Sequence, residues 1–200
     1  MVAGASETGV LSTPTARPTQ ELLSTSTLMA AILAHLLDPA RIALNVQSTR
    51  RTAALCEIAH LLDGHPDVTD FQGFYRDLLA REDLDTTCLG NDVAIPHART
   101  EHVAKIVLAV GRSDQGVLFD HDRQTVRLIF VLGTPTAAAG EYLQVVGMLC
   151  RIIKDPANLG ALMQAPTAAA FIQTLTDLEA RVRAPAAGLC GPGPAISGRG

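Results

Sequence analysis

Two short stretches of the chain are almost entirely apolar, and they constrain its fold more than any other feature. Residues Ile106 to Val110 and Val126 to Leu132 have the length of strands, and neither shows the alternation expected of a strand with one face in water. Both stretches are therefore typical of strands that are buried on both faces. Such strands need helices packed above and below the sheet that they form.

Helical patterns occur both before and after this strand-rich middle. Apolar residues recur at helical spacing in six segments: 28–37, 49–64, 69–81, 136–154, 156–164 and 167–183. Ser48 or Thr49 is the expected N-cap of the second helix, and Thr69 with Gln72 forms an expected capping box for the third. Shorter strands are expected at 41–46, 93–95 and 117–119. The order predicts an α/β fold, a single domain with a central β-sheet flanked by helices on both sides.

The two ends differ in composition from the middle. Residues 1–20 are rich in Ser, Thr, Pro and Ala, and residues 184–200 are rich in Gly, Pro and Ala. Neither end offers enough apolar area to offset the entropy cost of ordering its backbone. We therefore expect a disordered tail at 1–20, one domain at 21–183, and a second disordered tail at 184–200.

Composition excludes several classes of protein. The 48% hydrophobic content suffices for a core, and a net charge of −4 without clustered basic residues argues against binding nucleic acid. The stretch from Leu28 to Leu37 is about half the length that spans a bilayer, and no secretory signal is evident. The cysteines are far apart and are expected to be reduced: Cys56, Cys88, Cys150 and Cys190. These features predict a cytoplasmic protein that does not insert directly into a membrane.

One segment combines residues suited to phosphoryl transfer. The expected strand at 93–95 runs into Pro96, which cannot donate to a sheet ladder, so His97 follows where the strand stops. A neutral imidazole is a good nucleophile near pH 7. Arg81 and Arg99 are candidate partners, because a guanidinium matches the oxygens of a phosphoryl group. Thr87, beside Thr86, adds a hydroxyl.

The residues alone leave other interpretations open. A Pro-His-Ala-Arg run at a strand end also fits a structural or surface role for His97. Arg81, near the end of a helix, could instead act as a cation that interacts favourably with the helix dipole. Arg99 could be solvated, and Thr86 and Thr87 could be turn residues. No cysteine or carboxylate completes a metal-ligand spacing near His97, so neither a metal nor another cofactor is expected. The chain has no GxxxxGK[ST] loop, so ATP is not the expected phosphoryl donor.

The same segment resembles the signature of a known family. The matching residues are Arg81-Glu82, Thr87, Gly90 and the run from Val93 to His97, and a weaker similarity extends over about 35–180. This pattern is similar to the fructose/mannitol class of enzyme IIA domains (type-2 IIA) of the bacterial phosphotransferase system, which includes nitrogen-regulatory IIA proteins. The resemblance implies a single α/β domain with a mixed sheet between helices. It also implies that His97 accepts phosphate from HPr and passes it to a IIB component, with Arg81 holding the phosphate.

Two positions depart from the family pattern. The family usually has a second active-site histidine followed by Leu where this chain reads Glu141-Tyr142-Leu143. Tyr142 can donate a hydrogen bond through its hydroxyl but cannot become an imidazolium. Asp92 stands where the family favours glycine, and its carboxylate could repel phosphate or could face solvent.

Three functions follow from these observations. The first is a phosphoryl carrier of the phosphoenolpyruvate-dependent sugar phosphotransferase system, with an HPr-type protein and a IIB component as partners. The second is a regulatory module whose phosphorylation on His97 is read by a target protein through the added negative charge. The third is a binding domain that has lost phosphotransfer, for which Tyr142 and Asp92 are the only indications.

Overall fold

The computed structural model describes residues 32–119 and 124–184 of the 200-residue chain. The expected tail at 1–20 lies outside these ranges. So does the tail at 184–200 except for its first residue, and so does Cys190. The limits predicted for the domain, 21–183, therefore stay a prediction.

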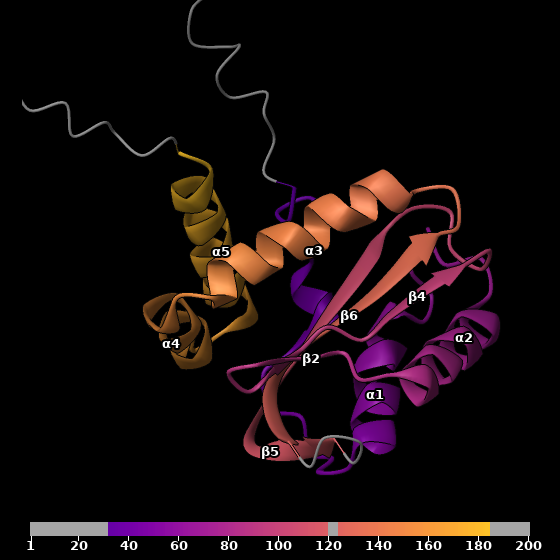
Figure 1. Ribbon diagram of the computed structural model, residues 1–200, viewed down its shortest axis with the longest axis horizontal. Helices are drawn as coiled ribbons and strands as arrows, with labels where there is room; N and C mark the ends of the chain where they lie inside the picture. Colours follow the sequence, from indigo (N-terminus) through magenta and orange to yellow (C-terminus); the bar gives the residue numbers. More distant parts are fainter. Residues whose placement is uncertain (1–31, 120–123, 185–200) are drawn as a thin grey trace, which may run out of the picture. The chain divides into compact units, whose positions relative to one another are not determined.

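A mixed six-stranded sheet forms the centre of the described chain (Figure 1). Its strands are β1 (Ile42–Ala43), β2 (Cys88–Gly90), β3 (Val93–Ala94), β4 (His97–Thr100), β5 (Val107–Phe119) and β6 (Gln124–Pro135). The order is β1-β5-β6-β3-β2, with β4 also paired to β6. β5 and β6 are antiparallel, as are β2 and β3, whereas β1 runs parallel to β5, and β3 and β4 run parallel to β6. The mixed sheet is confirmed.

Helices cover both faces of this sheet. They are α1 (Arg51–Ala59), α2 (Phe71–Leu84), α3 (Ala139–Ile153), α4 (Pro156–Gln164) and α5 (Ala168–Arg183), with short 3-10 turns at Pro39–Arg41 and His60–Leu62. One core cluster joins α1 and α2 to the sheet, and another joins α3, α4 and α5 to its opposite face. Figure 1 shows α1 and α2 on one side of the strands and α3 on the other. The α/β prediction is confirmed.

The two apolar stretches are buried as predicted. Every residue from 107 to 110 and from 128 to 132 is buried, and alternate side chains enter the two core clusters. The strands predicted at 106–110 and 117–119 are two parts of one strand, β5, whose register with β6 shifts between Arg112 and Val117. Gly116 has a φ of +83° in this irregular part, a conformation that glycine adopts without strain.

Both predicted N-caps are wrong. Arg50 precedes α1 and makes no side-chain cap, whereas Asp70 caps α2 by accepting a hydrogen bond from the backbone N–H of Gly73 at 3.1 Å. The carboxylate of Glu57 instead accepts from the backbone of the residues before α1, at 3.0 Å and 3.1 Å. These bonds hold the segment before the helix and do not cap the N–H groups of its first turn.

Some predicted helix limits also need correction. Residues 32–36 form turns rather than part of a helix at 28–37, and 28–31 lie outside the described ranges. α2 continues to Leu84 rather than ending near 81, and α3 begins at Ala139 rather than at Thr136. Along the described ranges, no helix is long and apolar enough to cross a bilayer.

A close approach of α2 to the sheet sets the position of β4. Gly133 of β6 pairs with Ala98 of β4, and a Cβ built on Gly133 would lie 2.8 Å from Val107 and 2.9 Å from the ring of Phe74. Any larger residue would displace α2 from this part of the sheet. The glycine therefore allows α2 to pack against β4, the strand that begins with His97.

Candidate functional site

His97 is the first residue of β4, and its strand continues the line of β3. β3 pairs with β6 up to Ala94, and pairing resumes where His97 lies opposite Leu132. Pro96 has no N–H, but its carbonyl still accepts a hydrogen bond from the backbone of Leu132 at 2.9 Å. The expectation that His97 follows the end of a strand is right for β3. The proline interrupts the ladder, however, and does not end it.

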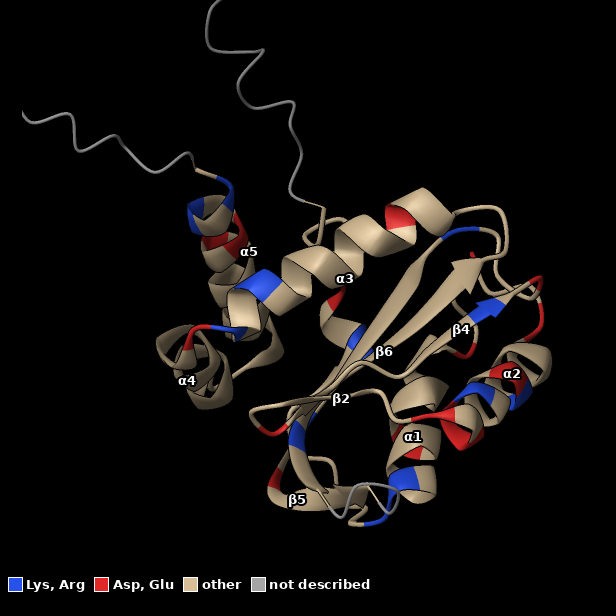
Figure 2. Ribbon diagram, in the orientation of Figure 1, with Lys and Arg blue, Asp and Glu red and all other residues tan. Residues whose placement is uncertain are grey.

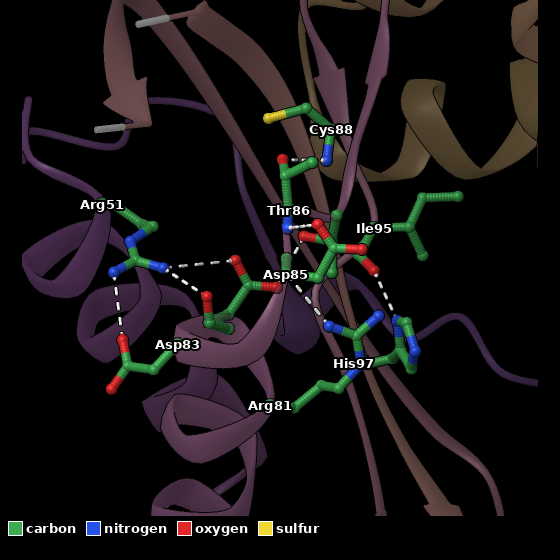
Figure 3. Close-up of polar contacts among 10 residues, drawn as sticks. Arg51, Arg81, Asp83, Asp85, Thr86, Cys88, Ile95 and His97 are labelled. Atoms are coloured by element: carbon green, nitrogen blue, oxygen red, sulfur yellow. Dashed lines mark hydrogen bonds and ion pairs between the residues drawn. The ribbon is translucent and has the colours of Figure 1, made fainter. Parts of the chain in front are cut away.

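The imidazole of His97 is half-buried and held in one orientation. Its Nδ1 lies 3.0 Å from the carbonyl oxygen of Ile95, as Figure 3 shows. A carbonyl oxygen can only accept, so Nδ1 carries the proton and the neutral ring has its lone pair on Nε2. No hydrogen bond to Nε2 occurs within the described ranges. This nitrogen is therefore the nucleophilic atom of the ring.

The surroundings of His97 favour its neutral form. Burial lowers the pKa of the imidazole below its ordinary value, and the positive charge of Arg81 lowers this pKa further. The hydrogen bond to the Ile95 carbonyl raises the pKa and only partly offsets these effects. At neutral pH the ring is therefore uncharged and able to attack an electrophile.

Arg81 approaches His97 from the last turn of α2. Its Nη1 donates to the carbonyl oxygen of Asp85, just beyond the helix, at 3.0 Å. In Figure 3 the guanidinium lies beside the imidazole of His97, in agreement with its effect on the histidine pKa. Arg81 therefore satisfies a carbonyl at the helix end and also lines the hollow at His97, a geometry that is compatible with both roles considered for it.

Tyr142 faces His97 from the first turns of α3. The centroids of the two rings are 5.2 Å apart and their planes are inclined at 39°. Burial raises the pKa of the phenol, against an opposing effect of Arg81 and Arg99, so the hydroxyl stays protonated at neutral pH. Tyr142 thus supplies a neutral hydrogen-bond donor beside the histidine.

Arg99 and Thr87 have partners of their own. Arg99 donates from Nη2 to the carbonyl oxygen of Thr136 at 2.8 Å, which joins β4 to the loop before α3. Thr87 is buried, and its hydroxyl donates to a carboxylate oxygen of Glu82 at 2.6 Å. A hydroxyl engaged in this way is not free for phosphate. Thr87 therefore supports the strand beside the site, and the role considered for it as a phosphate donor is not favoured by the geometry.

Two adjoining hollows meet at His97. One has a volume of about 330 Å³ and is lined by α2 and β4, including Arg81 and Arg99. The other has a volume of about 170 Å³ and extends past Thr87 toward Tyr142. His97 and Arg81 line both, so a group bound to Nε2 has a cation beside it.

Sequence reasoning missed two features of this region. Asp77 lines the larger hollow and accepts a hydrogen bond from Thr100 at 2.6 Å. Its spacing of four residues from Arg81 places both on one helix face and could have revealed it. The other feature is a set of exposed leucines in the segments that form the site: Leu84 at 82%, Leu89 at 45% and Leu143 at 66% exposure. Leu84 and Leu89 line the two hollows, and Leu143 follows Tyr142.

Asp92 does not belong to this site. It is exposed, lines neither hollow at His97, and lies beside Arg127 in a separate hollow. Its φ of +61° falls in the left-handed region, which favours glycine. Of the two roles considered for this carboxylate, facing solvent agrees with the structure and repelling phosphate at His97 does not.

A comparison with known proteins identifies the family. The family model described as "Phosphoenolpyruvate-dependent sugar phosphotransferase system, EIIA 2" matches residues 35–178. The chain belongs to this family. The EIIA 2 domain is 34% identical over 148 residues to a nitrogen regulatory protein of Pseudomonas aeruginosa, covering 74% of this chain and 96% of that protein. It is 28% identical over 140 residues to a fructose-like EIIA component of Escherichia coli, covering 70% and 91%.

Solved structures agree with this assignment. The nitrogen regulatory protein IIA-Ntr of Neisseria meningitidis superimposes on the EIIA 2 domain with a TM-score of 0.67 at 30% identity, covering 72% of this chain and 99% of that one. The resemblance to type-2 IIA domains is thereby confirmed. Among the residues whose positions are described, no cluster of three or more His, Cys, Asp or Glu side chains could hold a metal ion.

Proposed function

We propose that this EIIA 2 domain carries a phosphoryl group on Nε2 of His97. One observation carries the proposal: the Ile95 carbonyl, 3.0 Å from Nδ1, leaves Nε2 as the nucleophilic nitrogen in a hollow that Arg81 also lines. Nε2 attacks the phosphorus of a phosphohistidine on an HPr-type carrier. The new N–P bond forms as the donor's N–P bond breaks, and the donor imidazole leaves with the electron pair. The guanidinium of Arg81 neutralises the phosphoryl oxygens.

A second displacement at phosphorus delivers the group to the next protein. A thiolate on a IIB component attacks the phosphorus, and His97 leaves as a neutral imidazole that keeps its proton on Nδ1. The Tyr142 hydroxyl, beside the ring, donates a hydrogen bond to the phosphoryl group during both transfers. Arg99, tethered to the backbone at Thr136, contributes positive charge at the outer side of the hollow.

The exposed leucines near His97 support a protein partner rather than a small substrate. Leu84 and Leu89 are 82% and 45% exposed and line the two hollows that share His97 and Arg81. A grouping of exposed apolar side chains, rather than a single one, marks a surface that binds another protein. A phosphocarrier that docks on them would bring its phosphohistidine to His97 and would exclude water from the transfer. Such partners act in the cytoplasm, which is the location that we propose.

A regulatory role is the second candidate. Relatives named as nitrogen regulatory proteins support it, from Pseudomonas aeruginosa and Neisseria meningitidis. In this role, a regulatory target protein would distinguish the free from the phosphorylated His97 by its added charge. Loss of phosphotransfer is the third hypothesis, and it would require His97 to remain unmodified in the presence of a competent phosphoryl donor.

One experiment tests the proposal and separates the candidates. The full chain is incubated with enzyme I, HPr and phosphoenolpyruvate, and its mass is followed. We expect a gain of one phosphoryl group that is labile in acid, stable in base and absent in His97→Ala. Absence of the gain in the unaltered chain would contradict the proposal. A gain that can be transferred to a IIB component indicates the carrier role, whereas one that no IIB accepts indicates the regulatory role.

A further inference from the structure

A separate hollow lies between the β2–β3 turn, β6 and one face of α4. Its volume is about 380 Å³, and its lining includes Asp92, Arg127, Leu159, Gly160 and Met163. None of these residues lines the hollows at His97. The phosphoryl-transfer proposal makes no use of this hollow.

The hollow contains one positive and one negative side chain that do not pair. The backbone N–H of Arg127 donates to the carbonyl oxygen of Asp92 at 2.7 Å, so the two residues are neighbours. Nevertheless, no ion pair or hydrogen bond joins their side chains, although both line the hollow. Two unlike charges that do not neutralise each other can each pair with an oppositely charged group of a ligand.

The remaining wall of the hollow is apolar. Leu159 and Met163 are four residues apart and so lie on one face of α4, a helix without any charged residue. Figure 2 shows this helix entirely in tan between charged segments at its start and in α5. At Gly160 a Cβ would meet nothing within 4 Å, which leaves open space between the charges and the helix.

We propose that this hollow binds a free α-amino acid with an aliphatic or thioether side chain. The carboxylate of the ligand pairs with Arg127 and its ammonium group with Asp92. Its side chain lies against Leu159 and Met163. Separated opposite charges beside an apolar wall match a zwitterion with an apolar side chain, whereas an anion alone would leave Asp92 close to its own charge. A volume of about 380 Å³ is within the range of small-molecule sites.

Isothermal titration calorimetry on the full, unphosphorylated chain tests this site independently of His97. The probes are L-leucine and L-methionine, with three analogues that each lack one recognised group. L-leucinamide lacks the carboxylate, 4-methylpentanoate lacks the ammonium group, and glycine lacks the side chain. We expect L-leucine or L-methionine to bind and each analogue to bind at least ~10-fold more weakly.

Three variants locate the binding. Asp92→Asn keeps a residue that tolerates the left-handed backbone but removes the charge, and Arg127→Gln removes the cation. Gly160→Leu fills the hollow, and because glycine is unfavourable inside a helix, this variant is expected to fold at least as well as the parent. Gly147→Leu, on α3 where a Cβ also meets nothing within 4 Å, is the matched control.

We expect each of the three variants to weaken binding at least ~10-fold and the control to leave it unchanged. Either of two results would overturn the proposal. One is no heat of binding for either amino acid at about 10 mM ligand. The other is 4-methylpentanoate binding as tightly as L-leucine with no effect of Asp92→Asn, which would indicate a simple anion site.

Discussion

The aromatic ring of Tyr142 packs beside the imidazole of His97, with ring centroids 5.2 Å apart. The two residues come from different sides of the site, since His97 begins β4 and Tyr142 lies in the first turns of α3. Tyr142 also occupies the place where the family usually has a second histidine. Tyrosine at this position keeps a hydrogen-bond donor beside His97, but, unlike a histidine, it does not titrate near neutral pH.

Replacing Tyr142 by phenylalanine tests the role of its hydroxyl. The ring contact with His97 is retained, so we expect the fold to be preserved. If the hydroxyl donates to the phosphoryl group, its loss removes about 1 kcal/mol of transition-state stabilisation, or about fivefold in rate. Rapid-quench measurement of phosphoryl transfer from HPr checks this. An unchanged rate would show that the hydroxyl makes no contact with the transferring group.

Removing the charge of Arg81 should raise the pKa of His97. Because Arg81 lowers that pKa, Arg81→Met should bring it closer to its ordinary value, while Arg81→Lys should keep it low. NMR titration of the His97 ring protons measures the change. A pKa of His97 that is identical in Arg81→Met and in the parent would contradict the electrostatic coupling.

The lowered pKa of His97 also affects stability. The folded chain resists protonation of this ring more than the unfolded chain does. The contribution of the neutral ring is therefore present above the ordinary pKa and is lost as pH falls from that value through the lowered one. Urea unfolding at a series of pH values should show a smaller acid-side loss in Arg81→Met than in the parent.

Thr87→Val is expected to act on stability rather than on chemistry. Its hydroxyl donates to the buried carboxylate of Glu82 at 2.6 Å, and losing a hydrogen bond to a charged group costs about 2 kcal/mol. Urea denaturation should show this loss, and Thr87→Ser should show much less. Transfer rates of the folded protein should stay within about twofold of the parent, because no phosphate contact is removed. A selective loss of transfer without destabilisation would reverse this assignment.

The exposed leucines near His97 should affect partner binding without affecting the fold. The double variant of Leu84→Ser and Leu143→Ser removes apolar side chains that are 82% and 66% exposed, so stability should change by less than about 0.5 kcal/mol. The KM for phosphorylated HPr should rise by about 10-fold while kcat stays nearly constant. Leu118→Ser, at 44% exposure in β5, is the control. Equal effects of the control and the double variant would argue against a docking surface.

The backbone at Asp92 predicts an unusual order of stabilities. With a φ of +61°, Asp92→Ala should lower the free energy of unfolding by about 1 kcal/mol, since a Cβ without a polar group is strained there. Asp92→Gly should not lower it, because glycine adopts this conformation freely. Thermal unfolding of the two variants measures the difference. Equal stability of the alanine and glycine variants would contradict the explanation.

Local sequence patterns correctly predicted the buried strands and one helix boundary, but they did not predict the N-caps. The apolar runs at 106–110 and 126–132 indicated strands covered on both faces, and the boundary predicted between helices at 136–154 and 156–164 separates α3 from α4. These predictions hold because they depend on side-chain type and on neighbours in sequence. The N-caps failed because several polar residues compete at each helix start, and only the folded backbone selects among them, as Asp70 shows.

The amino-acid order made His97 and Arg81 candidates through the resemblance of their segment to type-2 IIA domains, since the residues alone also fitted structural roles for both. It could not reveal that the Ile95 carbonyl orients the ring, that Glu82 engages Thr87, or that Asp92 lies outside the site. Those relationships depend on distances between segments that meet only when β3, β4 and α2 pack together. Pairing and burial determine which polar atoms stay free, and only the free atoms can take part in binding or transfer.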